Sequence, residues 1–330
     1  MKESKWAIGI DIGGTKINIA AVNDQGQVMK CMHLVTQVKA GVDSIINDIA
    51  TVCRKLCTEY AQPPLGVGIG MAGQVDSHTG FVHLAPNLYW VDVPLGEKLE
   101  KLLGLPVSIT NDVRASTIAE WKYGAGKGCD NFVCCFIGTG VGGGIVSNGL
   151  LLEGFSNSAG EIGHIAVEMD GLPCTCGRTG CLETYVGGLA MSKRVQEWIA
   201  AHPEISHGLG DPQHITAKIL VEGFRKNDPV SVAIIGKARK ALVAGMKGVV
   251  NVLNPERLIL GGGIVYGLPE LIDWLREDIK HAALAIATKK LEIVPAALGS
   301  DSGLIGASAL ILEKPPAKRY EPNASKLRKT

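Results

Sequence analysis

Three cysteines within eight residues, in the stretch CTCGRTGC, are the first sign of chemistry in this sequence. Together with His164, the thiols of Cys174, Cys176 and Cys181 form a set with nine, one and four residues between its members. Four nitrogen and sulfur ligands in one polar, glycine-rich segment fit a closed tetrahedral zinc site. The alternative is a redox-active cysteine pair, but a reducing cytosol and the nearby histidine favour zinc. Such a zinc would be structural and would stiffen a loop too polar to be stabilised by burial.

Two glutamates lie on either side of this cluster. Glu161 and His164 belong to EIGHIAV, and Glu183 follows the last cysteine in CLET. Carboxylates and an imidazole that converge can accept several hydroxyl protons, which suits a polyol such as a sugar. His164 could bind zinc through one ring nitrogen and meet a sugar hydroxyl with the other. Each glutamate alone would be a solvated surface side chain, and the metal cluster between them argues against that interpretation.

Asn111 and Asp112, in ITNDVRAS, fall where a buried strand is predicted to give way to a helix. Loops at the carboxyl ends of strands are where α/β sheets bind ligands. An aspartate in this place could be a helix N-cap and nothing more. The functional alternative is a general base, which accepts a proton from a substrate hydroxyl while a phosphoryl group arrives.

Three glycine-rich turns are candidates for binding a nucleotide. In DIGGTK, backbone N–H groups can approach a phosphate closely, and the neighbouring carboxylate can hold Mg²⁺ directly or through water. Alone, this could be a plain hairpin turn, but GTGVGGG occupies the matching place in a weak internal repeat. Two such turns are better explained by a polyphosphate that lies across a cleft, and LGGGI, between a strand and a helix, could pack against adenosine. The nucleotide-binding candidates are Asp11, Gly13, Gly14, Thr15, Lys16, Gly138, Thr139, Gly140, Gly261, Gly262 and Gly263.

The elements that would position these residues alternate between strands and helices. Strand, glycine turn, strand, turn and strand are predicted over residues 5–35 and again over 131–154. Helical periodicity follows over 41–61, 183–202 and 229–253. The repeat predicts two related α/β domains with mainly parallel central strands and a cleft between them, and a length of 330 residues also favours two domains.

Composition and missing motifs exclude several classes of protein. A net charge of +1 predicts no broad surface for nucleic acid or membrane, and no apolar run approaches the ~20 residues of a membrane helix. Without a signal-peptide pattern, the protein is expected to be cytoplasmic, and its nine cysteines then argue against disulfides. Cys31, Cys53, Cys57, Cys134 and Cys135 are expected in the core.

No GxxxxGK[ST] run exists, which excludes a P-loop ATPase, and dinucleotide binding is disfavoured. The basic segment 314–330 is expected to be a frayed tail.

Eight motifs occur in the order seen in ROK-family sugar kinases, and the chain resembles the bacterial glucokinases of that family most. They are IGIDIGGTKINIA, GIGMAGQVD, ITNDVRAS, GTGVGGGI, GEIGHIAV, CTCGRTGCLE, LILGGGI and GLIGASAL. The resemblance runs from Trp6 to about Leu312. The cysteine cluster together with EIGH is highly specific, whereas DIGGT alone would indicate only the broader actin-like ATPase superfamily.

The resemblance implies an α/β protein with the actin-like ATPase (ribonuclease H-like) fold, in which two α/β domains flank a cleft for ATP and sugar. Residues 1–113 plus about 296–330 would form the smaller domain, and 114–295 the larger one with the zinc site. It also implies transfer of the γ-phosphoryl group of ATP, with Mg²⁺, to a hexose hydroxyl, with glucose 6-phosphate as the favoured product. Homodimers are common in this family.

The resemblance also assigns roles to residues by their position. Asp112 would be the catalytic base, Asp11 would serve the metal and phosphates, and the three glycine turns would bind the nucleotide. The implied sugar-binding set is Gly73, Asn87, Asn111, Asp112, Glu161, His164 and Glu183. The implied zinc ligands are His164, Cys174, Cys176 and Cys181.

Other functions stay open at this point. Within kinases, the acceptor could be N-acetylmannosamine, N-acetylglucosamine, fructose or allose. A sugar-responsive repressor of the same family would carry an added N-terminal helix-turn-helix, for which the ten residues before Asp11 leave no room. A non-catalytic sugar sensor is a further alternative, and the presence of Asp112 argues against it.

Overall fold

The computed structural model describes residues 5–313, and its strands form two five-stranded sheets and one smaller sheet. The first sheet contains β1 (Trp6–Ile12), β2 (Lys16–Asn23), β3 (Val28–Val35), β4 (Val67–Met71) and β8 (Val107–Asn111). The second contains β9 (Phe132–Ile137), β10 (Val141–Ser147), β11 (Leu150–Leu151), β12 (Arg257–Gly261) and β13 (Glu292–Pro295). The smaller antiparallel sheet contains β5 (Gln74–Asp76), β6 (Phe81–Ala85) and β7 (Trp90–Val93).

The two large sheets repeat the same topology. Their strand orders are β3-β2-β1-β4-β8 and β11-β10-β9-β12-β13. In the first, β1 is antiparallel to β2 and parallel to β4; in the second, β9 is antiparallel to β10 and parallel to β12. The internal repeat predicted from the two glycine turns is therefore confirmed, since each turn joins the first two strands of its sheet.

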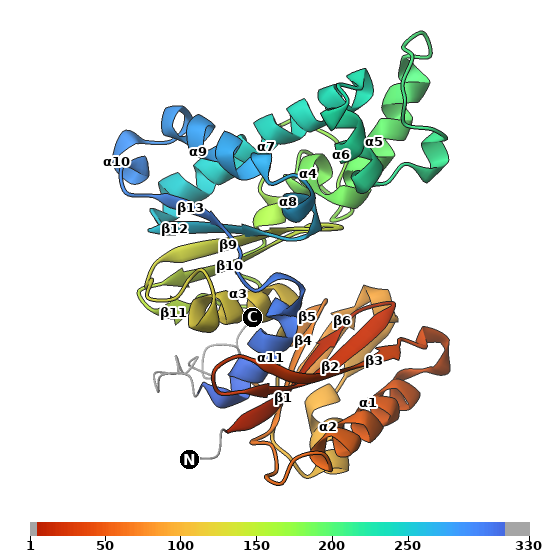
Figure 1. The fold of residues 1–330 in the computed structure, drawn as a ribbon, viewed down its shortest axis with the longest axis vertical. Helices are drawn as coiled ribbons and strands as arrows, with labels where there is room; N and C mark the ends of the chain where they lie inside the picture. The colour runs from red at the N-terminus through yellow and green to blue at the C-terminus, as the bar shows by residue number, and fades with distance from the viewer. Residues whose placement is uncertain (1–4, 314–330) are drawn as a thin grey trace, which may run out of the picture.

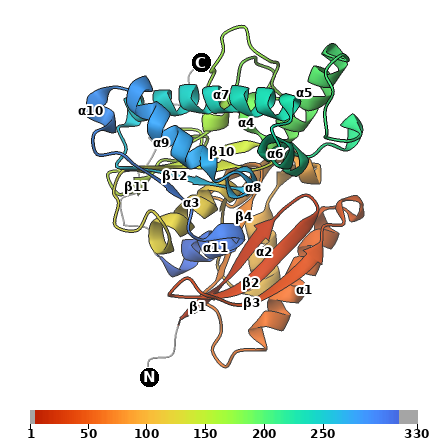
Figure 2. The ribbon, with the colours of Figure 1, turned by 45° about the horizontal axis from the view of Figure 1, so that its top comes forward.

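Helices cover the outer faces of the sheets and fill the space between them (Figures 1 and 2). The first half carries α1 (Val42–Cys57) and α2 (Leu95–Leu103). The second half carries α4 (Glu183–Val186), α5 (Gly188–Ala201), α6 (Ala217–Arg225), α7 (Pro229–Leu253), α8 (Gly263–Gly267), α9 (Glu270–Ala282) and α10 (Ala285–Thr288). Between the sheets lie α3 (Asp112–Tyr123) and α11 (Ser302–Leu312). No helix within residues 5–313 has the length and apolar character needed to cross a membrane.

The predicted continuous helix over 183–202 is wrong, because Gly187 separates α4 from α5. Its backbone is extended, with φ −67° and ψ 137°. The break turns the first N–H groups of α5 toward the second glycine turn, where Gly188 donates to the Gly138 carbonyl at 2.8 Å and Leu189 to the Thr139 carbonyl at 3.1 Å. The requirement to satisfy this turn comes from a distant part of the chain, so helical periodicity alone did not reveal it.

Each half has its own apolar core. In α1, the residues at helical spacing, among them Ile45, Ile49 and Leu56, are buried against the first sheet as their periodicity predicts. The long helix α7 buries one side in the same way over the second sheet. Of the five cysteines expected in the core, Cys53, Cys134 and Cys135 are buried, and Cys31 and Cys57 are half-buried.

Glycines let α3 and α11 approach their neighbours at backbone distance. A Cβ at Gly9 would lie 2.1 Å from a backbone oxygen of α11, and one at Gly68 would lie 1.7 Å from the Ala307 carbonyl oxygen. Where the two helices meet, a Cβ at Gly306 would lie 1.6 Å from the Ala115 carbonyl oxygen. Any side chain at these positions would push the elements apart, so these glycines set the close spacing of the layer between the sheets.

A buried carboxylate on α3 holds the segment that returns from the second half to the first. Glu120 is 0% exposed, and its carboxylate accepts the backbone N–H groups of Ala125 at 2.8 Å and of Ala297 and Leu298 at 2.9 Å each. These donors replace the water that a buried carboxylate loses. The domain boundaries near residues 113 and 296 stay a prediction, and the predicted tail, 314–330, lies outside the described residues.

Candidate functional site

A cavity of about 640 Å³ opens between the two sheets. It lies at the carboxyl ends of β1, β8 and β12, where parallel strands of α/β sheets present ligand-binding loops. Both halves contribute to its lining, which includes Asp11, Asp112, Ser116, Gly262, Gly263 and Gly303. Four of the residues singled out from the sequence therefore face one common space.

Asn111 and Asp112 divide two roles at the start of α3. The N-cap is Asn111, whose side-chain oxygen accepts the N–H groups of Val113 at 2.9 Å and Arg114 at 3.3 Å. Asp112 is the first residue of the helix and lines the cavity. The interpretation of Asp112 as only an N-cap is therefore wrong, because its neighbour fills that role and leaves Asp112 facing the cavity.

The environment of Asp112 favours proton acceptance. Burial raises the pKa of its carboxyl, and the charges of Asp11 and Glu161 raise it further, while the N–H of Val113 acts in the opposite direction. Burial also raises the pKa of Asp11, against a hydrogen bond from Asn18 and the charge of Lys16. A carboxylate with a raised pKa is a stronger base once ionised. Two half-buried carboxylates that repel one another are also a donor set suited to Mg²⁺.

Each of the two glycine turns is closed by a backbone hydrogen bond between residues two or three positions apart. Gly13 donates to the Lys16 carbonyl at 3.0 Å, and Gly138 donates to the Gly140 carbonyl at 2.9 Å. A side chain at Gly14 would be crowded, since its Cβ would lie 3.0 Å from the Cβ of Asn87. Asn87, expected on the sugar wall, therefore also lies directly against this turn.

Glu183 joins the cysteine loop to the second glycine turn. Its carboxylate accepts the N–H of Val141 at 2.8 Å. A Cβ at Gly140 would lie 2.4 Å from a carboxylate oxygen of Glu183. The glycine at this position is therefore required for the contact, and the turn and the loop are held in one arrangement.

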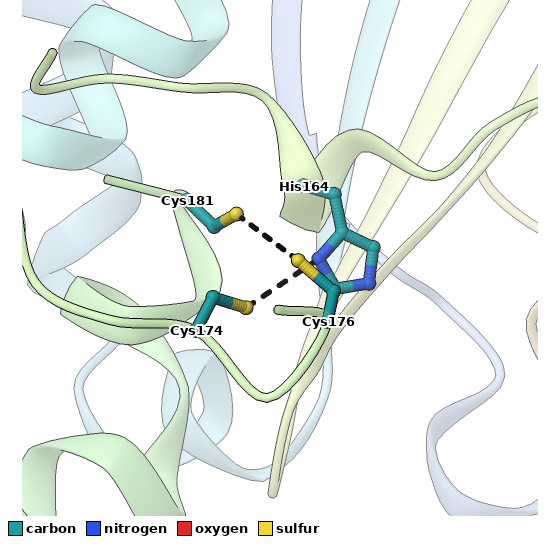
Figure 3. Close-up of side chains that lie close together, drawn as sticks. All are labelled: His164, Cys174, Cys176 and Cys181. Atoms are coloured by element: carbon teal, nitrogen blue, oxygen red, sulfur yellow. Dashed lines mark hydrogen bonds between the residues drawn. The ribbon is translucent and has the colours of Figure 1, made fainter. Parts of the chain in front are cut away.

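The four predicted zinc ligands converge on one point (Figure 3). One ligand atom from each of His164, Cys174, Cys176 and Cys181 lies within 4.8 Å of all the others. The Cys176 and Cys181 sulfurs are 3.7 Å apart, as are the Cys174 sulfur and Nδ1 of His164. Around tetrahedral zinc with Zn–S bonds of about 2.3 Å, two sulfurs lie about 3.8 Å apart, and a sulfur and a nitrogen about 3.5 Å apart. These spacings fit zinc, and all nine cysteines of the chain are free.

Two glycines with positive φ shape this loop. Gly177 has φ 83° and Gly180 has φ 73°, in the region that disfavours other residues. A Cβ at Gly180 would also lie 1.8 Å from the Glu168 carbonyl oxygen. The Cys174 N–H donates to the Arg178 carbonyl at 2.7 Å and closes the turn that contains Gly177.

The remaining predicted residues are not part of the cavity lining. Glu161 precedes and His164 ends a short 3₁₀ turn, and both are exposed. Gly73 lies between β4 and β5, where a Cβ would approach the Leu84 carbonyl oxygen to 2.6 Å. Gly261 lies inside β12, where a Cβ would meet the ring of Phe136, so it spaces the sheet while the next two glycines line the cavity.

Sequence reasoning missed one wall of the cavity. Gly299, Ser300, Ser302 and Gly303 line it at the start of α11. The hydroxyls of Ser302 and Ser116 are 3.2 Å apart and connect α11 to α3. The signal was the run GSDS directly before GLIGASAL, which is rich in glycine and serine between a strand and a helix.

Comparison with known proteins agrees with this geometry. The ROK family model matches residues 7–314. The chain belongs to the ROK family. A glucokinase of Halalkalibacterium halodurans is 33% identical over 316 residues, which cover 94% of this chain and 96% of that protein. The crystal structure of a ROK family glucokinase from Streptomyces griseus, in complex with glucose and AMPPNP, matches with a TM-score of 0.78 and 33% identity, covering 92% of this chain and 98% of that one.

The family also contains regulators. The xylose repressor of Bacillus subtilis is 25% identical to this ROK chain over 316 residues, and the match covers 94% of this chain and 78% of the repressor. The ROK kinases and this chain share the actin-like ATPase fold, which is the fold class predicted from the motifs.

Proposed function

We propose that this ROK protein is an ATP-dependent hexose kinase that converts glucose to glucose 6-phosphate. The observation that carries the proposal is the position of Asp112, a half-buried carboxylate with a raised pKa in a cavity lined from both sheets. The relatives that match over almost their whole length include a glucokinase and a glucokinase structure that holds glucose and a nucleotide analogue.

The side chains have distinct tasks in this proposal. Asp112 takes the proton of the acceptor hydroxyl as its oxygen attacks the γ-phosphorus, and the bond between that phosphorus and the ADP oxygen breaks. The backbone N–H groups of the glycine turns 13–15 and 138–140 other than those of Gly13 and Gly138, which close the turns, bind the phosphates, and Gly262 and Gly263 face the adenosine. Asp11 would hold Mg²⁺, which would neutralise phosphate charge when bound with ATP.

The sugar is bound by groups that the cysteine cluster supports. Asn111 keeps its amide N–H₂ for the sugar, because only the side-chain oxygen is used as the N-cap. Glu161, His164 and Glu183 accept hydroxyl protons, with Gly73 and Asn87 on the opposite wall. Zinc would be held by Nδ1 of His164 and the three thiolates, which leaves Nε2 of His164 for a hydroxyl. The zinc ion would contribute by making the loop that carries the cysteines rigid.

Two further assignments follow the family resemblance. We propose that the protein is a homodimer and that it works in the cytoplasm as part of carbohydrate metabolism, at the entry of glucose into glycolysis. Nine free cysteines suit a reducing compartment. Sedimentation analysis of the purified protein tests the dimer.

The decisive experiment is a coupled assay of ADP release with ATP, Mg²⁺ and one sugar at a time. The panel is glucose, N-acetylmannosamine, N-acetylglucosamine, fructose and allose, and glucose is expected to give the highest kcat/KM. The Asp112→Asn variant is the blank for ATP hydrolysis that does not depend on the base. A different best sugar would reassign the acceptor, and sugar binding by calorimetry without any turnover would support the non-catalytic sensor instead.

A further inference from the structure

A buried arginine lies next to the proposed base without a part in phosphoryl transfer. Arg114 is 4% exposed and belongs to the first turn of α3, two residues after Asp112. Its guanidinium donates to the side-chain and main-chain oxygens of Asn157 at 2.5 Å each. It also donates to the carbonyl oxygens of Glu153 and Ala159 at 3.4 Å. Four contacts thus bind the start of α3 to the loop 153–159.

Asn157 continues this link into the first half of the molecule. Its amide nitrogen donates to the Val75 carbonyl at 2.7 Å and lies 3.2 Å from the hydroxyl of Ser77. That hydroxyl donates to the Glu153 carboxylate at 2.9 Å. The backbone of Asn157 is left-handed, with φ 60°, which asparagine tolerates better than most residues. The loop 153–159 is therefore hydrogen-bonded both to α3 and to β5 and the turn that follows β5.

The same loop leads directly into the proposed sugar site. Only Gly160 separates Ala159 from Glu161, and a Cβ at Gly160 would lie 2.7 Å from the Gly143 carbonyl oxygen of β10. This short, tightly packed connection leaves Glu161 little freedom relative to the loop. The charges of Glu153 and Glu161 oppose the effect of burial, which lowers the pKa of Arg114. The cation is therefore electrostatically coupled to a carboxylate of the sugar site as well as hydrogen-bonded to the loop.

A buried guanidinium carries a desolvation cost, and a neutral side chain could fill the same space. Arg114 contacts the segment that directly precedes Glu161. Arg114 itself lies two residues after Asp112 on the same helix. We propose that Arg114 is a positioning residue for the hexose: through Asn157 it sets Glu161 against Asp112 and ties both to β5. This inference rests on the proposed kinase function and adds the residues that determine sugar affinity.

Three variants test the link. Asn157→Gly removes the amide and keeps the left-handed backbone, Ser77→Ala removes the bond to Glu153, and Arg114→Lys keeps the charge with fewer donors. Loss of one charge-assisted hydrogen bond corresponds to about a 10- to 100-fold change in an equilibrium constant. We expect Asn157→Gly to raise the KM for glucose by about that factor and to leave the KM for ATP within about twofold. Arg114→Lys should give an intermediate KM, and combining it with Asn157→Gly should add little.

Asn254→Gly is the matched control. Asn254 is also left-handed, with φ 43°, but it caps the C-terminus of α7 on the outer face of the second sheet. Both KM values should be unchanged in this variant. Zinc content and the unfolding midpoint of each variant establish that it is folded; if Arg114→Lys does not fold, Asn157→Gly and Ser77→Ala carry the test.

The outcomes separate the two proposals. Equal changes in both KM values for Asn157→Gly, or no change in either, would overturn the positioning role while wild-type turnover keeps the kinase assignment. If the wild type phosphorylates no hexose, the kinase proposal fails, and calorimetric glucose binding to wild type and Asn157→Gly then decides the positioning role alone. A weaker affinity in the variant supports that role, and equal affinities refute it.

Discussion

Replacing Asp112 by asparagine should remove the proposed base and at the same time stabilise the fold. The carboxylate is half-buried, and its pKa is raised, first by this desolvation and then by the charges of Asp11 and Glu161. Asparagine keeps an oxygen that can accept the N–H of Val113, now bonded at 2.9 Å, and has no charge to bury. Activity and stability should therefore change in opposite directions.

The sizes of both effects can be worked out. General-base catalysis contributes about 10²- to 10⁴-fold, so kcat should fall by that factor. For each pH unit by which the pKa in the folded protein exceeds that in the unfolded chain, ionised Asp112 lowers the free energy of unfolding by about 1.4 kcal/mol. With an unfolding entropy of about 0.7 kcal/mol/K for 330 residues, this equals about 2 °C in the midpoint.

The sign of the pH dependence follows from the raised pKa. Between the unfolded and folded pKa values, the folded state holds more protons, so wild-type stability falls as the pH rises through this window. The stability gap between Asp112→Asn and wild type should appear above about pH 4, where the unfolded carboxyl ionises, and reach its full size above the folded pKa. Wild-type kcat/KM should rise over the same range as the base ionises.

Steady-state kinetics and thermal unfolding at several pH values measure these effects together. Asp48→Asn, on the exposed side of α1, is the matched control and should leave both activity and midpoint unchanged. An Asp112→Asn variant with near wild-type turnover would refute the assignment of the base. The electrostatic reasoning would be refuted by an inactive variant whose stability gain over wild type is no larger at pH 8 than at pH 4.

Three further predictions concern the elements around the site. Cys176→Ala should lose bound zinc and raise the KM for glucose, and elemental analysis that finds no zinc in the native protein would contradict the cluster assignment. Glu120→Ala should lower the free energy of unfolding by about 3 kcal/mol or more, because three backbone N–H groups lose their acceptor; chemical denaturation measures this. Gly306→Ala should destabilise by at least about 1–3 kcal/mol, since its Cβ would meet a carbonyl oxygen at 1.6 Å. Gly248→Ala on α7, with open space around the new Cβ, should stabilise by about 0.5–1 kcal/mol, and equal midpoints for these two variants would refute the packing argument.

Local patterns carried much of the fold and the candidate site. The two glycine turns predicted the repeated sheets, because a strand–turn–strand unit is fixed by residues close in sequence. The cysteine cluster predicted its own convergence for the same reason, since three of its four members lie within eight residues.

Features that depend on distant contacts were not predictable from such patterns. The wall formed by residues 299–303 faces the cavity only because α11 returns to the first sheet. Gly187 breaks a helix to satisfy the turn at Gly138, about fifty residues earlier. Glu120 and Arg114 looked like ordinary polar residues of a helix, and only the folded chain shows that both are buried by partners from other segments. The sequence also left open whether Asp112 is only the N-cap of α3, and the structure gives that role to Asn111.

Both covalent crossings between the two sheets meet on α3. The first crossing is this helix, which begins directly after β8, and the second is the segment at Ala297, which Glu120 binds. If the halves rotate relative to one another when substrates enter, the axis of that rotation must run close to α3. Points far from the axis, such as the rims of the cavity, would then move most. Asp112, at the end of the same helix, would keep nearly the same place in open and closed states.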